Sequence, residues 1–149
     1  MSVALELAAE DVAVELGLPV AMRMVSYGFV GVEPEVMGVG PIPSTEKALA
    51  KAGLTIDDIG LFELNEAFAA QNLGVIREME AQSGMTIDQE KWNPNGGAIS
   101  IGHPNGASGG RIAMFAMRQL EKTGGKYGLF SSCCGGGHGT TTIIENLRR

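Results

Sequence analysis

Hydrophobic residues recur along this chain at spacings that predict alternating helices and strands. Two segments repeat them at three- and four-residue intervals, which bring side chains onto one face of a helix. In residues 109–123 this face consists of Ile112, Ala116 and Leu120. In the segment that follows residue 68 it consists of Ala69, Leu73 and Ile76.

Boundary residues predict two shorter helices. One covers residues 9–16 and is closed by Gly17, and the other covers 44–52 and is closed by Gly53. Ser44 is a suitable N-cap for the second helix, because its hydroxyl can accept a hydrogen bond from a free N–H of the first turn. Residues 34–43 are expected to form a loop, and the polar segment 81–92 a surface excursion.

Runs of β-branched, aromatic and other apolar residues between these helices predict strands. They lie at 20–32, 61–64, 127–132 and 140–144. The last two flank a Cys-Gly run and are expected to form a hairpin. Alternation of strands and helices indicates an α/β layered domain.

Composition narrows the possible partners of this domain. The 149 residues have a formal net charge of −6, which argues against binding nucleic acid through its phosphates. No apolar run approaches the length needed to cross a membrane, so no membrane partner is expected. The two cysteines are adjacent and cannot link distant parts of the chain, which favours a reducing, cytoplasmic location.

Two glycine-rich segments carry the candidate chemistry. In one, Cys133 stands just before Gly135-Gly136-Gly137, and in the other His103 lies between a Gly-rich run and a predicted helix. A thiolate can act as nucleophile or base, and glycines let backbone N–H groups approach a ligand. These features suggest a Cys/His proton-transfer pair.

Simpler interpretations remain open for each candidate residue. Cys133 could be a small buried apolar residue, as we expect of Cys134, and His103 could simply bond loop carbonyls. Asn65 could cap the helix that follows it, and Met37 and Phe68 could belong to the core. A zinc site from the cysteines and histidines is disfavoured, because adjacent cysteines point apart and no Cys-x-x-Cys spacing exists.

Three blocks occur in a fixed order: Asn-Glu-Ala-Phe-Ala-Ala-Gln at 65–71, Gly-His-Pro at 102–104 and Cys-x-Gly-Gly-Gly at 133–137. With the flanking sequence from about residue 4 to 147, they resemble the C-terminal half of a thiolase, an acyltransferase that makes or cleaves 3-ketoacyl-CoA. The resemblance implies a layered α/β/α fold, a mixed sheet with helices on both faces. It also implies acyl-CoA and CoA as ligands, and neither a metal nor a bound cofactor.

The resemblance also implies roles for single residues. Cys133 corresponds to the acid/base cysteine that moves the α-proton, and His103 to the histidine that activates the nucleophilic cysteine and holds the enolate oxygen. Asn65 corresponds to the asparagine that orients a water at that oxygen, and the N–H of Gly135 to a donor of the second oxyanion hole. Three positions correspond to the lining of the pantetheine tunnel: Met37, Ala67 and Phe68.

A complete thiolase is more than twice as long and carries its acyl-accepting cysteine in an N-terminal half. No such cysteine is present here. We therefore expect residues 1–19 to be a remnant of the last strand and helix of that half, and 20–149 to be the C-terminal domain. The expected partners are a separate N-terminal half or further copies of this chain. The alternative is a non-catalytic module that binds CoA thioesters or serves assembly.

Overall fold

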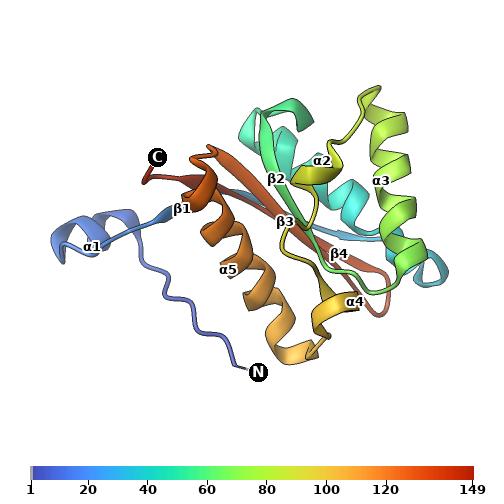
Figure 1. The fold of residues 1–149 in the computed structure, drawn as a ribbon, viewed down its shortest axis with the longest axis horizontal. Helices are drawn as coiled ribbons and strands as arrows, with labels where there is room; N and C mark the ends of the chain where they lie inside the picture. The colour runs from blue at the N-terminus through green and yellow to red at the C-terminus, as the bar shows by residue number, and fades with distance from the viewer. Residues whose placement is uncertain (1) are drawn as a thin grey trace.

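The computed structural model describes residues 2–149, in which a mixed sheet has the strand order β1-β4-β3-β2 (Figure 1). Its strands are β1 Met22–Gly31, β2 Ile59–Leu64, β3 Tyr127–Cys134 and β4 His138–Asn146. β4 pairs antiparallel with both β1 and β3, whereas β2 runs parallel to β3. The predicted strands and the hairpin of β3 and β4 are therefore confirmed.

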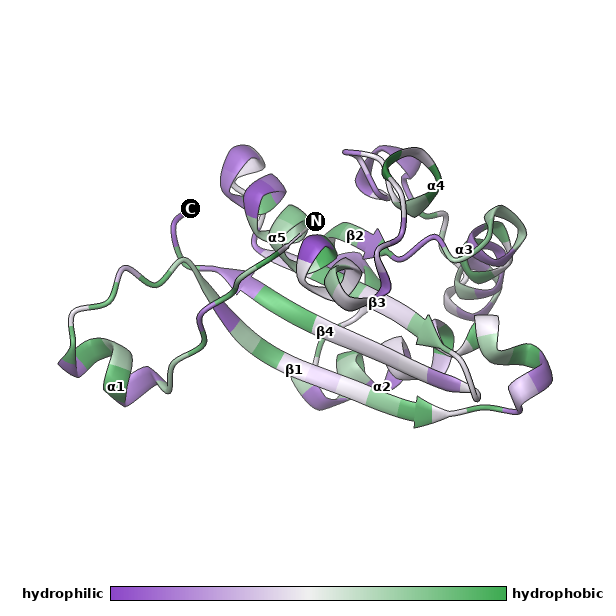
Figure 2. Ribbon diagram, turned by 90° about the horizontal axis from the view of Figure 1, so that it is seen from below, coloured by the Kyte–Doolittle hydropathy of each residue, from purple (hydrophilic) through white to green (hydrophobic). Residues whose placement is uncertain are grey.

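Helices cover both faces of the sheet, as predicted (Figure 2). The helices are α1 Glu10–Glu15, α2 Pro41–Ala52, α3 Ala69–Ser83, α4 Ala98–Ile101 and α5 Asn105–Thr123. Three short 3-10 helices are η1 Pro34–Val39, η2 Ile56–Asp58 and η3 Gln89–Lys91. The arrangement is an α/β/α layering, with α2 on one face of the sheet and α5 on the other.

The alternation of side chains along β2 divides the core between the two faces. Phe62 and Leu64 belong to the larger apolar cluster, which α2 and α3 cover. Leu61 points the other way and joins the smaller cluster with Ala116 and Leu120 of α5. The apolar face predicted for residues 109–123 is therefore the face that packs on the sheet, although α5 begins four residues earlier than predicted, at Asn105.

Several local predictions were wrong in whole or in part. Residues 34–43 are not a loop throughout, because they form η1 and the first residues of α2. α2 begins at Pro41, whose fixed φ suits a first turn, so Ser44 lies inside the helix and bonds the Thr141 hydroxyl at 2.7 Å. On α3, Leu73 is 56% exposed, and Asn72 faces inward because it accepts the indole N–H of Trp92 at 2.7 Å.

The predicted surface excursion at residues 81–92 holds for most of the segment but not for all of it. α3 continues to Ser83, and the segment then returns to the core, where Ile87 and Trp92 are buried. Trp92 stacks on Phe62 and forms an isolated parallel bridge with it. The segment therefore extends the sheet edge beside β2.

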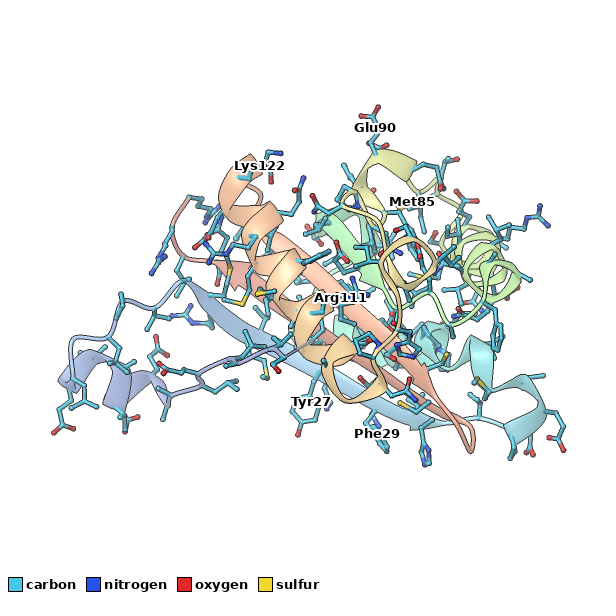
Figure 3. The ribbon with its side chains drawn as sticks, turned by 60° about the horizontal axis from the view of Figure 1, so that its bottom comes forward. Tyr27, Phe29, Met85, Glu90, Arg111 and Lys122 are labelled. Atoms are coloured by element: carbon cyan, nitrogen blue, oxygen red, sulfur yellow. The ribbon has the colours of Figure 1, made fainter. Side chains whose placement is uncertain are left out.

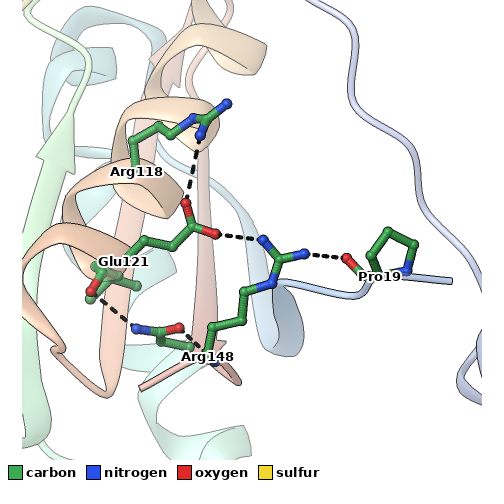
Figure 4. A network of polar contacts seen from close by, with 6 residues as sticks. Pro19, Arg118, Glu121 and Arg148 are labelled. Carbon is green, nitrogen blue, oxygen red and sulfur yellow. Dashed lines mark hydrogen bonds and ion pairs between the residues drawn. The ribbon is translucent and has the colours of Figure 1, made fainter.

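The N-terminal segment lies beside the sheet. Residues 2–9 contain no strand, and α1 stands apart from the other elements (Figure 1). The connection from α1 to β1 is tied to α5 through Arg148, which donates to the Pro19 carbonyl and pairs with Glu121 at 3.1 Å (Figure 4). The division of the chain at residues 19 and 20 stays a prediction.

Candidate active site

Three predicted site residues, Asn65, Cys133 and Gly135, lie at the carboxyl ends of β2 and β3, where parallel strands commonly present functional groups. Asn65 directly follows β2, and its backbone N–H donates to the Ser131 carbonyl at 2.9 Å, which continues the ladder between the strands. The side chain is buried, and its Oδ1 has no hydrogen-bond partner. An amide with a free acceptor is thus held at the end of the sheet.

His103 comes from a different part of the chain, the loop between α4 and α5, and meets this amide. Its Nε2 lies 3.5 Å from Asn65 Nδ2, and its Nδ1 lies 2.7 Å from Ser108 Oγ. Ser108 is buried in the first turn of α5 and donates to the Pro104 carbonyl at 3.2 Å. These bonds form one chain of donors from the amide through the imidazole to the loop backbone.

Ser108 was missed by sequence reasoning. The available signal was a serine five residues after a loop histidine, in the first turn of a helix whose apolar face had been recognised. A small hydroxyl in that turn points back toward the preceding loop. Its contact fixes the imidazole orientation, which is the usual task of a second hydrogen-bond partner of a functional histidine.

Glu66 and Asn93 were missed as well, although they hold the site together. Asn93 Oδ1 accepts the Leu64 N–H at 2.8 Å and its Nδ2 donates to the Leu64 carbonyl at 2.9 Å, so its amide replaces a strand partner. Its Nδ2 also donates to Glu66 Oε1 at 3.1 Å, while Glu66 Oε2 accepts the Ile99 N–H at 3.0 Å. A Cβ at Gly97 would collide with the Glu66 carboxylate, so this approach requires glycine.

The prediction that Cys134 is a buried apolar residue was wrong. Cys133 is the buried one, and Cys134 is exposed. Successive strand residues point to opposite sides of a sheet, which decides the difference. Burial, and to a smaller degree Cys134, raises the pKa of the Cys133 thiol above its ordinary value. In residues 2–149 no hydrogen bond joins this thiol to His103 or Asn65, so the predicted Cys/His pair is not directly hydrogen-bonded.

The remaining predicted residues lie in the turn between β3 and β4, just before α3, and in η1. Gly135 is exposed in the turn between β3 and β4, where Gly136 and Gly137 have φ of 82° and 86°. Phe68 is 66% exposed at the start of α3, while Ala67 and Met37 are half-buried. Gln71 donates to the Gly38 carbonyl at 3.1 Å, which links α3 to η1, the segment that carries Met37.

Two classes of site receive no support within the described part of the chain. Residues 2–149 hold no group of three or more His, Cys, Asp or Glu side chains placed to bind a metal ion. Across the same residues, no helix is both long and apolar enough to span a membrane.

A mixed sheet between helical layers, with an Asn–His–Ser chain at the ends of its parallel strands, defines an α/β/α domain with a polar site at the sheet edge. The family model described as "Thiolase, C-terminal domain" matches residues 18–146. The chain belongs to the thiolase family, of which it carries the C-terminal domain.

Relatives of known name support this membership. The chain is 52% identical over 138 residues to the acetyl-CoA acetyltransferase of Syntrophomonas wolfei, with 93% of this chain and 34% of the relative covered. It is 46% identical over 144 residues to the 3-oxoadipyl-CoA/3-oxo-5,6-dehydrosuberyl-CoA thiolase of Escherichia coli, with 97% and 35% covered. The chain thus spans about a third of the length of these relatives.

Solved structures agree with the fold. Human mitochondrial 3-ketoacyl-CoA thiolase matches with a TM-score of 0.88 and 43% identity, over 94% of this chain and 34% of that chain. A crystal structure of the same human enzyme in complex with CoA matches with a TM-score of 0.87, 43% identity, and 93% and 34% covered. The acetyl-CoA acetyltransferase of Bacillus anthracis gives 0.86, 41% identity, and 93% and 34% covered.

Proposed function

We propose that this chain is the C-terminal half of an acyl-CoA acyltransferase that makes or cleaves 3-ketoacyl-CoA by Claisen chemistry. Its part is to bind the acyl-CoA, to move the α-proton and to hold negative charge on the thioester oxygen. The observation that carries the proposal is the contact of Asn65 with His103 and of His103 with Ser108, at the strand end where the matched family motifs meet.

The Asn65–His103–Ser108 chain is suited to binding an enolate oxygen. Asn65 is buried and carries an amide with unused hydrogen-bonding capacity, which can orient a water molecule. In a neutral ring, His103 can donate from Nε2 to the same oxygen only when its Nδ1 accepts the Ser108 hydroxyl proton, because one ring nitrogen donates and the other accepts. If Ser108 Oγ instead accepts from Nδ1–H, Nε2 donates only when the ring carries both protons. Donors that are already oriented toward developing charge are the main electrostatic contribution to such reactions.

Cys133 is the proposed proton carrier. Burial raises the pKa of its thiol, so the chain alone holds it as a neutral thiol, the form that gives up a proton. In the cleavage direction that proton ends on the α-carbon of the departing acyl-CoA, which leaves a thiolate behind. In the condensation direction the thiolate takes the α-proton back. The N–H of Gly135 is proposed to hold the tetrahedral oxygen of the second step.

The acyl-accepting cysteine is proposed to come from an N-terminal thiolase half. An apolar surface on this chain is available for that contact: Tyr27 and Phe29 of β1 are 59% and 56% exposed. Their strand neighbour Gly28 faces Ser44 of α2, so Tyr27 and Phe29 point to the α5 side of the sheet. The apolar cluster under α5 has Leu61 of β2 and Ile144 of β4 at its centre, and Met22 and Phe130 pack against it. Exposed apolar patches commonly mark interfaces, so a second half or a further copy of the chain is expected to cover it.

The ligand set follows from the family. CoA and its thioesters are the proposed substrates, with no metal or bound cofactor, and Met37, Ala67 and Phe68 are proposed to line the pantetheine tunnel. Two free thiols side by side favour a reducing compartment such as the cytoplasm. The alternative is a module that binds CoA thioesters or serves assembly without turnover, because both cysteines of the sequence lie in the Cys133-Cys134 pair.

The test is a chimera in which this chain replaces the matching 34% of the Syntrophomonas wolfei acetyl-CoA acetyltransferase. The chimera and the chain alone are assayed for cleavage of acetoacetyl-CoA by CoA. We expect turnover by the chimera and none by the chain alone. Cys133→Ala and His103→Ala should each abolish turnover, whereas Cys134→Ala, at the exposed neighbouring thiol, is the matched control and should preserve it.

Each outcome decides between the candidates. A folded chimera without turnover that still binds acetyl-CoA by calorimetry would support the binding module. A folded chimera that does neither would refute both functions. Turnover by the chain alone that disappears in Cys133→Ala would show that no second half is needed.

A further inference from the structure

A buried carboxyl and a buried guanidinium lie beneath the site without partners. Glu63 of β2 and Arg111 of α5 are each 1% exposed. Both carboxyl oxygens of Glu63, and Nε and both Nη atoms of Arg111, have no hydrogen-bond partner. The Arg111 guanidinium lies over the Phe115 ring, whose centroid is 5.1 Å from Cζ. Figure 3 labels Arg111 on α5. Burying such groups is costly, so their retention calls for an explanation.

Their positions relate them to the Asn65–His103–Ser108 chain. Side chains alternate along β2, so Glu63 shares the α5 side of the sheet with Leu61, which packs on Ala116 and Leu120. On α5, Arg111 follows Ser108 by three residues and lies on the same buried face. The first turns of α5 therefore meet β2 at two levels. One is the hydrogen-bonded chain through His103, and the other, further from the strand end, is the pair Glu63 and Arg111, which form no hydrogen bond with each other.

The charge state of the Glu63–Arg111 pair depends on pH. Burial, opposed by Arg111 and assisted by Glu66, raises the pKa of Glu63 from 4.5 to about 8. Arg111 on α5 and Glu66 beyond the end of β2 are the charged groups in residues 2–149 that act on Glu63. His103 lies above them, in contact with Asn65. Loss of the Glu63 proton creates a carboxylate opposite a guanidinium, which attracts α5 toward β2.

We propose that Glu63 and Arg111 are positioning residues, a carboxyl–guanidinium couple that sets the spacing between β2 and the first turns of α5 and thereby the contact between Asn65 and His103. That contact measures 3.5 Å, at the outer limit of a hydrogen bond, so a small displacement of α5 makes or breaks it. The proposal deepens the proposed function and rests on it only in treating Asn65 and His103 as the working groups.

The test is a pH titration of the histidine rings by NMR in the full chain, which needs no turnover. The chain has only two histidines, so two ring Cε1 signals are expected. His138 lies on the hairpin, stacked on Phe29, and is the internal control. The His103 signal should show an inflection near pH 8, where Glu63 ionises. Glu63→Gln should remove that inflection, and the His138 signal should show neither effect.

A second pair of variants tests the guanidinium. Arg111→Lys keeps the charge but loses the planar fork, and should move the His103 signal at fixed pH. Arg118→Lys changes an exposed residue of the same helix and should leave it in place. If either variant fails to fold, the titration of the unaltered chain still decides.

Superimposable His103 curves in the native chain and Glu63→Gln, both without an inflection near pH 8, would overturn the proposal. So would variants that lose stability while the His103 signal stays unchanged, because the pair would then only support the fold. A chimera without turnover bears on the proposed function alone and leaves this titration unaffected.

Discussion

Glu63 should make the stability of this protein depend on pH in an unusual direction. A carboxyl whose pKa is raised on folding binds its proton more tightly in the folded chain. Its contribution to the free energy of unfolding is fully present below pH 4.5 and is lost as the pH rises through about 8. Ordinary paired carboxylates behave in the opposite way, because their pKa is lowered and they stabilise at higher pH.

The magnitude follows from the pKa values in the two states. Each pH unit between 4.5 and 8 contributes about 1.4 kcal/mol, which gives a ceiling of about 5 kcal/mol above pH 8. Relaxation around the buried charge reduces the observable loss to roughly 2–3 kcal/mol. Glu63→Gln keeps the shape of the protonated side chain but cannot ionise, so this loss should be absent from the variant.

The assay is urea denaturation of the native chain and Glu63→Gln at several pH values from acid to alkaline. Near pH 4.5 the two should have similar stability, and above pH 8 the variant should be the more stable. Glu46→Gln, an exposed position on α2, is the control and should change neither limit. Parallel stability curves for native chain and variant would refute the reasoning. If Glu63→Gln instead becomes less stable than the native chain as the pH rises, Arg111 lowers the Glu63 pKa through a close ion pair.

Two further predictions concern burial and close packing. Cys134 should react with iodoacetamide at least about tenfold faster than Cys133 near neutral pH, because Cys133 is buried and its thiol pKa is raised; equal rates in peptide-resolved mass spectrometry would contradict this. Gly28→Ala should cost about 1–3 kcal/mol, because the new Cβ would meet the backbone carbonyl of Ser44, whereas Gly31→Ala in the same strand meets nothing within 4 Å. Thermal unfolding compares the two variants, and equal losses would count against a steric cause.

Local sequence was sufficient for most of the fold. The spacing of Ile112, Ala116 and Leu120 identified the face of α5 that packs on the sheet, since a helix brings residues four apart onto one side. Gly53 ends α2 in the left-handed conformation that favours glycine. These features depend on neighbours within a turn or two, which a sequence displays directly.

Local sequence failed where two distant segments compete for one residue. Ser44 has the chemistry of an N-cap, but its hydroxyl is used by Thr141, 97 residues away. Leu73 fits the apolar spacing of α3, but Asn72 is buried in its place because it binds the indole of Trp92. In both cases a buried hydrogen bond outweighed a local preference.

The same division holds for the site. The sequence by itself determined the kinds and order of the reactive groups, and with them the family, because the motifs around Asn65, His103 and Cys133 are contiguous stretches. Only the tertiary structure decided which groups meet: Asn65 reaches His103 across 38 residues of sequence, while Cys133 is buried and, in the described residues, hydrogen-bonds neither of them. Contacts of that separation depend on how the ends of β2 and β3 and the start of α5 are brought together, and no local pattern records that arrangement.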